Sequence, residues 1–207
     1  MALVKYNNNS LSSVTSAAGF PAGAMTLIKT LTASSSSTLS FVDGSSDVVL
    51  DSTYPIYMFK FINMHPATDG TDFQFNGSAD TGSNYNVTKQ TAVFRANANE
   101  GDSAANLSYD TGRDLQQSTS FQNILSIIGN GDDECASGEL FLFNPSSTTF
   151  VKFFMGRGNI YLNSNYTRDE YLGGYFNTTS AIDAIQFKMA SGNIDAGTVK
   201  LYGIKDS

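Results

Sequence analysis

The chain has 207 residues and a mass of 22.2 kDa, and 41% of its residues are apolar, 12% aromatic and only 15% charged. A low share of charges with many Ser, Thr, Asn and Gly residues is typical of β-rich proteins, and 15 Phe and 10 Tyr exclude a disordered chain. The net charge is −7 and the 12 Lys and Arg residues are scattered singly, which argues against binding to nucleic acid or to an anionic membrane surface.

The sequence predicts neither secretion nor a membrane-spanning helix nor an internal disulfide. The N-terminal sequence MALVKYNNNSLSS lacks the basic start and apolar run of a secretory signal. No stretch approaches the run of about 18 apolar residues that a membrane-spanning helix needs. Cys135 is the single cysteine, so an internal disulfide is excluded, and its acidic neighbours at 132–134 disfavour a reactive thiolate. We therefore expect a soluble protein with no membrane partner.

Residues 1–24 are small and polar, and their few apolar residues follow neither a helical nor a strand period. We expect them to form an extended N-terminal arm that orders only against a partner or against the outside of its own domain. The side chains that would anchor this arm are Leu3, Val4, Tyr6, Leu11, Val14 and Phe20. Residues 25–207 contain no internal repeat and no break in composition, which predicts one domain.

The domain contains a series of short strand patterns separated by turn signals. The strongest pattern, at 54–63, is apolar on both faces, which predicts a central strand that is covered on each side. Further strands are expected at 25–32, 38–42, 72–76, 86–96, 139–144, 149–155, 159–163, 170–177, 182–189 and 198–204. The segment 121–128 fits a helix and a strand equally well, and the serine tract at 34–37 predicts a turn or bulge.

About ten or eleven short strands without helical patterns between them predict an all-β fold, a single β-sandwich or barrel. We expect the sandwich to be a jelly roll. Its two four-stranded sheets have long connections, which suit the predicted loops at 43–53, 64–71, 77–85 and 97–119.

Catalytic motifs are missing from the sequence. His65 is the only histidine, which excludes an HExxH zinc site, and there is no nucleophile elbow, phosphate-binding loop or dinucleotide-binding glycine motif. A carboxylate pair for glycoside hydrolysis would have to use Glu139 and Glu170, yet nothing around them predicts a raised pKa. The acidic turns do not follow the spacing of a calcium-binding loop. The sequence therefore predicts a non-enzymatic protein without a cofactor and without a metal.

Three tyrosines, Tyr161, Tyr166 and Tyr171, cluster along residues 159–171. Exposed aromatic rings can stack on sugar rings, but tyrosine is equally common in strands and in contacts between subunits. Two alternatives stay open for this cluster, a glycan-binding site and a subunit contact.

Five segments carry a resemblance to a known family: MALVKYNNNSLSSVTS at the start, LIKTLTASSSSTLSFVDG (27–44), DSTYPIYMFKFINMHPATDGTDFQFN (51–76), LFLFNPSSTTFVKFF (140–154) and GYFNTTSAIDAIQFKMASGNIDAGTVKLYGIK (174–205). Together they resemble virion structural proteins, mostly without an assigned role, of tailed bacteriophages that infect marine bacteria and cyanobacteria. The resemblance covers nearly the whole chain and consists of strand and turn segments, not of a catalytic signature. It is weakest over residues 97–135.

This resemblance implies a non-enzymatic protein of the virion, assembled in the host cytoplasm. We expect a capsid decoration or cement protein that grips the major capsid protein through its arm, as a symmetric homo-oligomer with a trimer as the expected state. The alternative is a receptor-binding module of a tail fibre or tailspike, which would recognise a cell-surface glycan through the exposed tyrosines. A glycan-cleaving virion enzyme that uses Glu139 or Glu170 ranks last. The fold alone does not choose among these functions.

Overall fold

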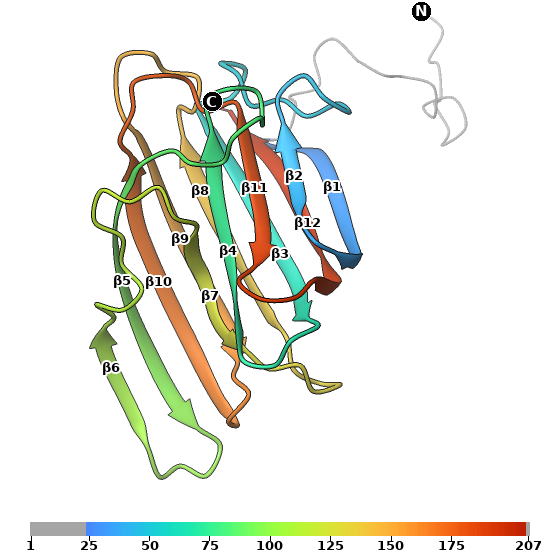
Figure 1. Ribbon diagram of the computed structural model, residues 1–207, viewed down its shortest axis with the longest axis vertical. Coiled ribbons are helices and arrows are strands. Elements are labelled where there is room, and N and C mark those ends of the chain that lie inside the picture. Colours follow the sequence, from blue (N-terminus) through green and yellow to red (C-terminus); the bar gives the residue numbers. More distant parts are fainter. Residues whose placement is uncertain (1–23, 206–207) are drawn as a thin grey trace, which may run out of the picture.

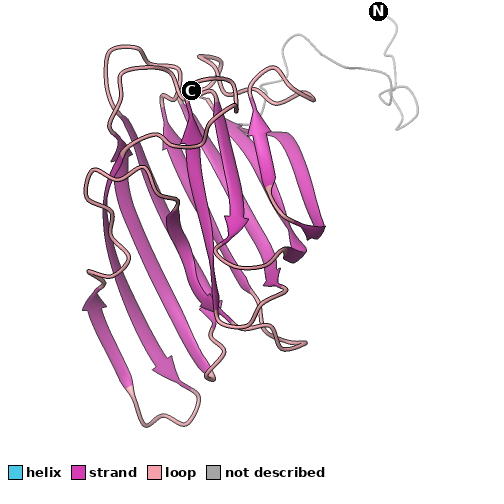
Figure 2. Ribbon diagram, in the orientation of Figure 1, coloured by secondary structure: helices cyan, strands magenta, loops and turns pink. Residues whose placement is uncertain are grey.

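The computed structural model describes residues 24–205, which form twelve β-strands and no helix (Figures 1 and 2). The strands are β1 (Met25–Ser36), β2 (Leu39–Val42), β3 (Ile56–Pro66), β4 (Thr71–Ser78), β5 (Lys89–Asn99), β6 (Ala105–Tyr109), β7 (Gln122–Ile128), β8 (Ala136–Phe143), β9 (Lys152–Tyr161), β10 (Tyr166–Phe176), β11 (Ala184–Met189) and β12 (Ile194–Ile204). The predicted all-β sandwich is confirmed. The predicted arm, with all six of its anchoring side chains, lies outside the described residues apart from Ala24.

Two antiparallel sheets make up the sandwich. The large sheet has eight strands in the order β1-β12-β3-β8-β9-β10-β5-β6, and the small sheet has four strands in the order β2-β11-β4-β7. Four strands of the large sheet, namely β9, β10, β5 and β6, lie beyond β8. The large sheet therefore extends past the small sheet on that side, which is the left of the view in Figure 1.

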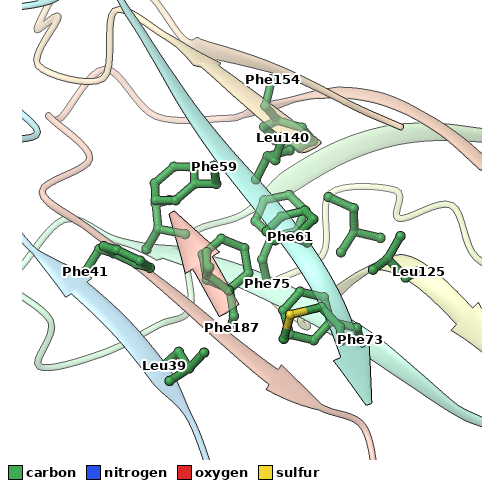
Figure 3. Packing of buried hydrophobic residues seen from close by; sticks show 14 of the residues in the cluster. Leu39, Phe41, Phe59, Phe61, Phe73, Phe75, Leu125, Leu140, Phe154 and Phe187 are labelled. Carbon is green, nitrogen blue, oxygen red and sulfur yellow. The ribbon is translucent and has the colours of Figure 1, made fainter. Parts of the chain in front are cut away.

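Phenylalanine rings from both sheets fill the space between them (Figure 3). Phe187 of β11 lies at the centre, and its ring centroid is 5.2 to 6.4 Å from those of five others. The five are Phe41, Phe59, Phe61, Phe73 and Phe75. Each of these rings is at most 2% exposed, and Phe73 and Phe75 alternate with Asp72 and Gln74, as expected for a strand with one buried face.

Strand β3 is central in the large sheet, between β12 and β8, as its sequence predicts. Its residues Tyr57, Phe59 and Phe61 are buried against the small sheet. On its second face, within residues 24–205, the predicted cover is only partial: the small sheet packs against the other face, yet Met58 is 4% exposed. On that second face Lys60 is half-buried and Ile62 is 39% exposed.

Several predicted boundaries differ from the observed strands. Strand β6 falls within the predicted loop 97–119, and the ambiguous segment 121–128 forms strand β7. The two strands predicted at 149–155 and 159–163 form the single strand β9, which is paired with β8 on one side and β10 on the other. Most of the serine tract extends β1, which pairs with β12 as far as Ser36. Pairing with distant strands decides these boundaries, and the local pattern does not contain that information.

Candidate interaction surface

The outer face of the large sheet carries exposed apolar and aromatic side chains. Side chains alternate along a strand, so Phe153, Met155 and Arg157 of β9 point outward while their neighbours point into the sandwich. Phe153 and Met155 are each 55% exposed, and Phe94 of β5 is 44% exposed. The small sheet covers none of these side chains, because it packs on the inner face.

Strand pairing aligns the outward residues in two neighbouring rows across the sheet. The stacked row runs from β5 to β3 and consists of Phe94, Tyr171, Arg157, Glu139 and Lys60. The apolar row lies one step further along β10, β9 and β8 and consists of Gly173, Met155 and Phe141. Directly opposite residues in adjacent strands are close enough for their side chains to touch.

Planar groups pack face to face in the stacked row. The rings of Phe94 and Tyr171 are parallel within 5°, with centroids 4.7 Å apart. The guanidinium of Arg157 lies 4.9 Å from the centroid of the Tyr171 ring. Since β5 and β9 lie on opposite sides of β10, these two neighbours cover both faces of Tyr171. Side chains of the same sheet therefore cover both faces of the Tyr171 ring.

Charges in the stacked row are paired locally. Arg157 donates two hydrogen bonds to Asp169, from Nε to Oδ1 at 3.0 Å and from Nη2 to Oδ2 at 2.6 Å. The hydroxyl of Tyr171 donates a third bond to Asp169 Oδ2 at 3.1 Å. The bonds from Arg157 are the main reason that the pKa of Asp169 is lowered. Glu139 lies 3.8 Å from the Nζ of Lys60. The row is therefore held in place while its charges largely cancel.

A groove of about 370 Å³ lies between the two rows. Its lining includes Phe94, Phe141, Met155, Tyr171 and Gly173. A Cβ built on Gly173 would meet nothing within 4 Å, so the floor of the groove is open at this position. Aromatic residues, Met and Arg are enriched in protein interfaces, and contiguous exposed apolar patches mark interaction sites. This composition suits a contact with another protein.

The structure separates the three tyrosines of the predicted cluster. Tyr161 and Tyr166 line a hollow of about 270 Å³ at the turn between β9 and β10, together with Asn99 and Glu100. A hydrogen bond to Glu100 is the main reason that the pKa of Tyr161 is raised. Tyr171 lines the groove between the two rows instead, so the three tyrosines do not form one site.

The two glutamates considered for hydrolysis lie on opposite faces of the large sheet. Glu139 is in the stacked row, whereas Glu170 is 1% exposed and points into the sandwich, where Ser126 Oγ donates to its Oε1 at 2.7 Å. The expectation of an ordinary pKa is wrong for Glu170, because burial raises it. With the backbone of the sheet between them, the two carboxylates cannot act on one glycosidic bond.

A partly buried cluster of charged residues lies beside Glu170, which pairs with Arg95 across β10 and β5. Asp110 forms ion pairs with Arg95 and Arg113, the second at 3.2 Å, and Arg113 also lies 3.6 Å from Asp72. The side chain of Asp110 is 8% exposed and that of Arg113 is 18% exposed. Sequence reasoning missed this cluster, because its members occur singly in segments that resemble solvent-facing loops and strand faces. It connects the loop after β6 to β4 and β5.

Within residues 24–205, no group of three or more His, Cys, Asp or Glu side chains lies close enough to hold a metal ion. The same part of the chain contains no helix that could cross a membrane. Comparison with protein-family models, with curated proteins and with solved structures finds no match to this chain. The family suggested by its sequence segments therefore stays a prediction.

Proposed function

We propose that this chain is a non-enzymatic structural protein of a tailed-bacteriophage virion, which decorates the capsid shell as a homo-oligomer. The observation that carries the proposal is the outer face of the large sheet, with its stacked row, its apolar row and the groove between them. In this proposal the outer face forms the contact between subunits, with a trimer as the expected state, and residues 1–24 attach the oligomer to the major capsid protein. The family resemblance of the sequence supports the same role.

The strand order supports a jelly roll as the finer description of the fold. Without the inserted pairs β5–β6 and β9–β10, eight strands remain in two sheets, β1-β12-β3-β8 and β2-β11-β4-β7. The first strand lies beside the last in one sheet, and the second lies beside the second-to-last in the other sheet. This order is expected for a jelly roll built from two Greek keys, a fold used in viral capsids and in lectins. It supports the virion role by analogy of fold alone.

A receptor-binding module of a tail fibre or tailspike is the second candidate function. The hollow at Tyr161 and Tyr166 favours it, because aromatic rings there lie beside the polar groups of Asn99 and Glu100. The carboxylate of Glu100 could accept a hydrogen bond from a sugar hydroxyl, whereas Oδ1 of Asn99 already accepts from the backbone N–H groups of Ser103 and Ala104. Tyr171 gives this candidate less support than its sequence position suggested, because both faces of its ring are covered.

The first experiment counts the copies of this chain in purified virions by quantitative mass spectrometry, relative to the major capsid protein. Hundreds of copies, in a simple ratio to the capsid protein, are expected for a decoration protein. A few dozen copies or fewer would contradict capsid decoration and favour the tail, with Tyr161 and Tyr166 as the residues to mutate. Absence from the virion would overturn both structural roles.

A pair of variants separates the arm from the outer face. Deletion of residues 1–23 leaves β1 intact, since this strand begins at Met25, and should abolish attachment to capsids without changing the oligomeric state. Met155→Asp places a charge in the apolar row and should dissociate the oligomer while leaving the exposed site folded. Capsid co-sedimentation and sedimentation velocity measure the two effects on the same preparations.

A further inference from the structure

Lys89 and Asn76 lie side by side in the interior of the sandwich. Asn76 is in β4 of the small sheet and Lys89 begins β5 of the large sheet, and both residues are 0% exposed. The Nζ of Lys89 donates to Oδ1 of Asn76 at 2.6 Å, and its other acceptor is the carbonyl oxygen of Val87 at 2.9 Å. The ring of Phe176 lies on a further side, with its centroid 5.7 Å from Nζ. This amine thus has an amide, not a carboxylate, as its side-chain partner.

Burial makes the Lys89 amine a nucleophile near neutral pH. Desolvation lowers its pKa from 10.5 to about 7, because the interior disfavours the ammonium form. The uncharged form of the amine is therefore populated near neutral pH, in contrast to an exposed lysine. An uncharged lysine in an apolar pocket is one of the activated nucleophiles that proteins use.

Hydrogen bonds hold the side-chain amide of Asn76 in place as the electrophile for this amine. Its Nδ2 donates to the carbonyl oxygens of Tyr85 at 2.6 Å and Thr119 at 2.9 Å, which fixes the plane of the amide. The backbone N–H of Gly77 donates to Oδ1 at 2.8 Å, where negative charge develops when the carbonyl carbon is attacked. Nζ is held 2.6 Å from Oδ1, and Cγ, the atom that it would attack, is bonded to Oδ1 at a distance of about 1.2 Å. Two groups held at such a distance react as if each were present at a very high concentration. A slow uncatalysed reaction between them can therefore go to completion.

We propose that Lys89 and Asn76 form an intramolecular isopeptide bond that joins β4 of the small sheet to β5 of the large sheet. The lone pair of Nζ attacks Cγ of Asn76, and a bond forms between Nζ and Cγ. The bond between Cγ and Nδ2 then breaks, and a proton passes from Nζ to Nδ2, which leaves as ammonia. The product is a secondary amide, and the reaction needs no oxidant, reductant or co-reactant. Exclusion of water from the site protects the product from hydrolysis.

Mass spectrometry of the full chain tests the proposal. The purified protein should be lighter than its sequence by about 17 Da, the mass of the ammonia released when the lysine displaces it. Digestion with trypsin localises the change, because trypsin cannot cleave after a lysine whose Nζ is acylated. We expect one peptide covering 61–95 that carries the mass loss and contains an uncleaved Lys89. An unmodified peptide 61–89 would overturn the proposal.

The same tryptic digest distinguishes the isopeptide bond from a succinimide at Asn76, which would give the same loss of mass. Asn76 precedes Gly77, and attack by the Gly77 nitrogen would give a succinimide that also releases ammonia. In that case trypsin still cleaves after Lys89 and the mass loss appears in peptide 61–89, which would refute the isopeptide bond.

Variants provide the matched controls. Lys89→Met and Asn76→Ala should each abolish the mass loss. Lys152 is also 0% exposed and pairs with the opposite side of Phe176 in the sheet, but its Nζ donates to the carbonyl oxygen of Thr178 at 3.2 Å. Lys152→Met should therefore keep the mass loss in full. If either of the first two variants fails to fold, the tryptic peptides of the wild-type protein still decide the question.

Discussion

Replacing Gly173 with valine should stabilise the folded domain and at the same time weaken its assembly. Gly173 faces outward between Ala92 of β5 and Met155 of β9, and a Cβ built there meets nothing within 4 Å. Glycine within a strand costs about 0.5–1 kcal/mol relative to alanine, and valine is favoured in strands. We expect the free energy of unfolding to rise by about that amount, which corresponds to an increase in Tm of about 1–4 °C for a chain of this length.

The same substitution fills the floor of the groove on the outer face. A side chain of a neighbouring subunit that docks in this groove would be displaced, and loss of one well-buried anchor at an interface costs about 2 kcal/mol or more. The dissociation constant of the proposed oligomer should therefore rise about 30-fold. Thermal unfolding followed by circular dichroism and sedimentation velocity over a range of concentrations measure the two effects. Destabilisation of the variant, or an unchanged sedimentation profile, would refute this account of the outer face.

Three further substitutions test the interior. Gly138→Ala should destabilise the domain by about 1–3 kcal/mol, seen in urea unfolding, because its Cβ would lie 2.4 Å from the backbone oxygen of Arg157. Phe187→Ala removes the central ring of the core and should cost about 3–5 kcal/mol, and a loss below about 1 kcal/mol in the same assay would contradict the packing described above. Burial raises the pKa of Glu170 above 4.5, so the folded protein binds this proton more tightly than the unfolded protein does. The free energy of unfolding therefore falls as the pH rises from 4.5 through the raised pKa. Glu170→Gln should therefore gain stability relative to wild type over that window, and urea midpoints that shift equally at pH 4 and pH 8 would exclude this effect.

The sequence was sufficient to predict the core. Phe73 and Phe75 alternate with polar residues, and Ile185, Phe187 and Met189 do the same in another strand. When only one face of a strand is buried, an alternating pattern allows one stable register, because a shift of one residue would turn all the apolar side chains toward solvent. All five side chains are at most 3% exposed.

The candidate surface and the buried polar groups needed the structure. Glu170 and Lys89 occur in predicted strands, where a charged residue is normally assigned to the solvent side. Their burial depends on which loops and strands cover them, and those segments are distant in sequence. The alignment of Met155 with Gly173 likewise depends on the register between β9 and β10. The apolar second face of β3 did signal a partly uncovered surface, since within residues 24–205 Ile62 on that face remains 39% exposed.

The pairing of early strands with late ones restricts when this protein can fold. β1 pairs with β12, and β2 pairs with β11, so the strands that leave the ribosome first have partners that are made last. Folds dominated by such distant pairings form slowly, on a scale of about milliseconds to seconds. A nascent chain that ends before residue 184 leaves β1 and β2 unpaired and an edge of β3 and of β4 open, which makes it prone to proteolysis and aggregation. Only a chain that has reached β12 can therefore complete both sheets and present the whole outer face of the large sheet.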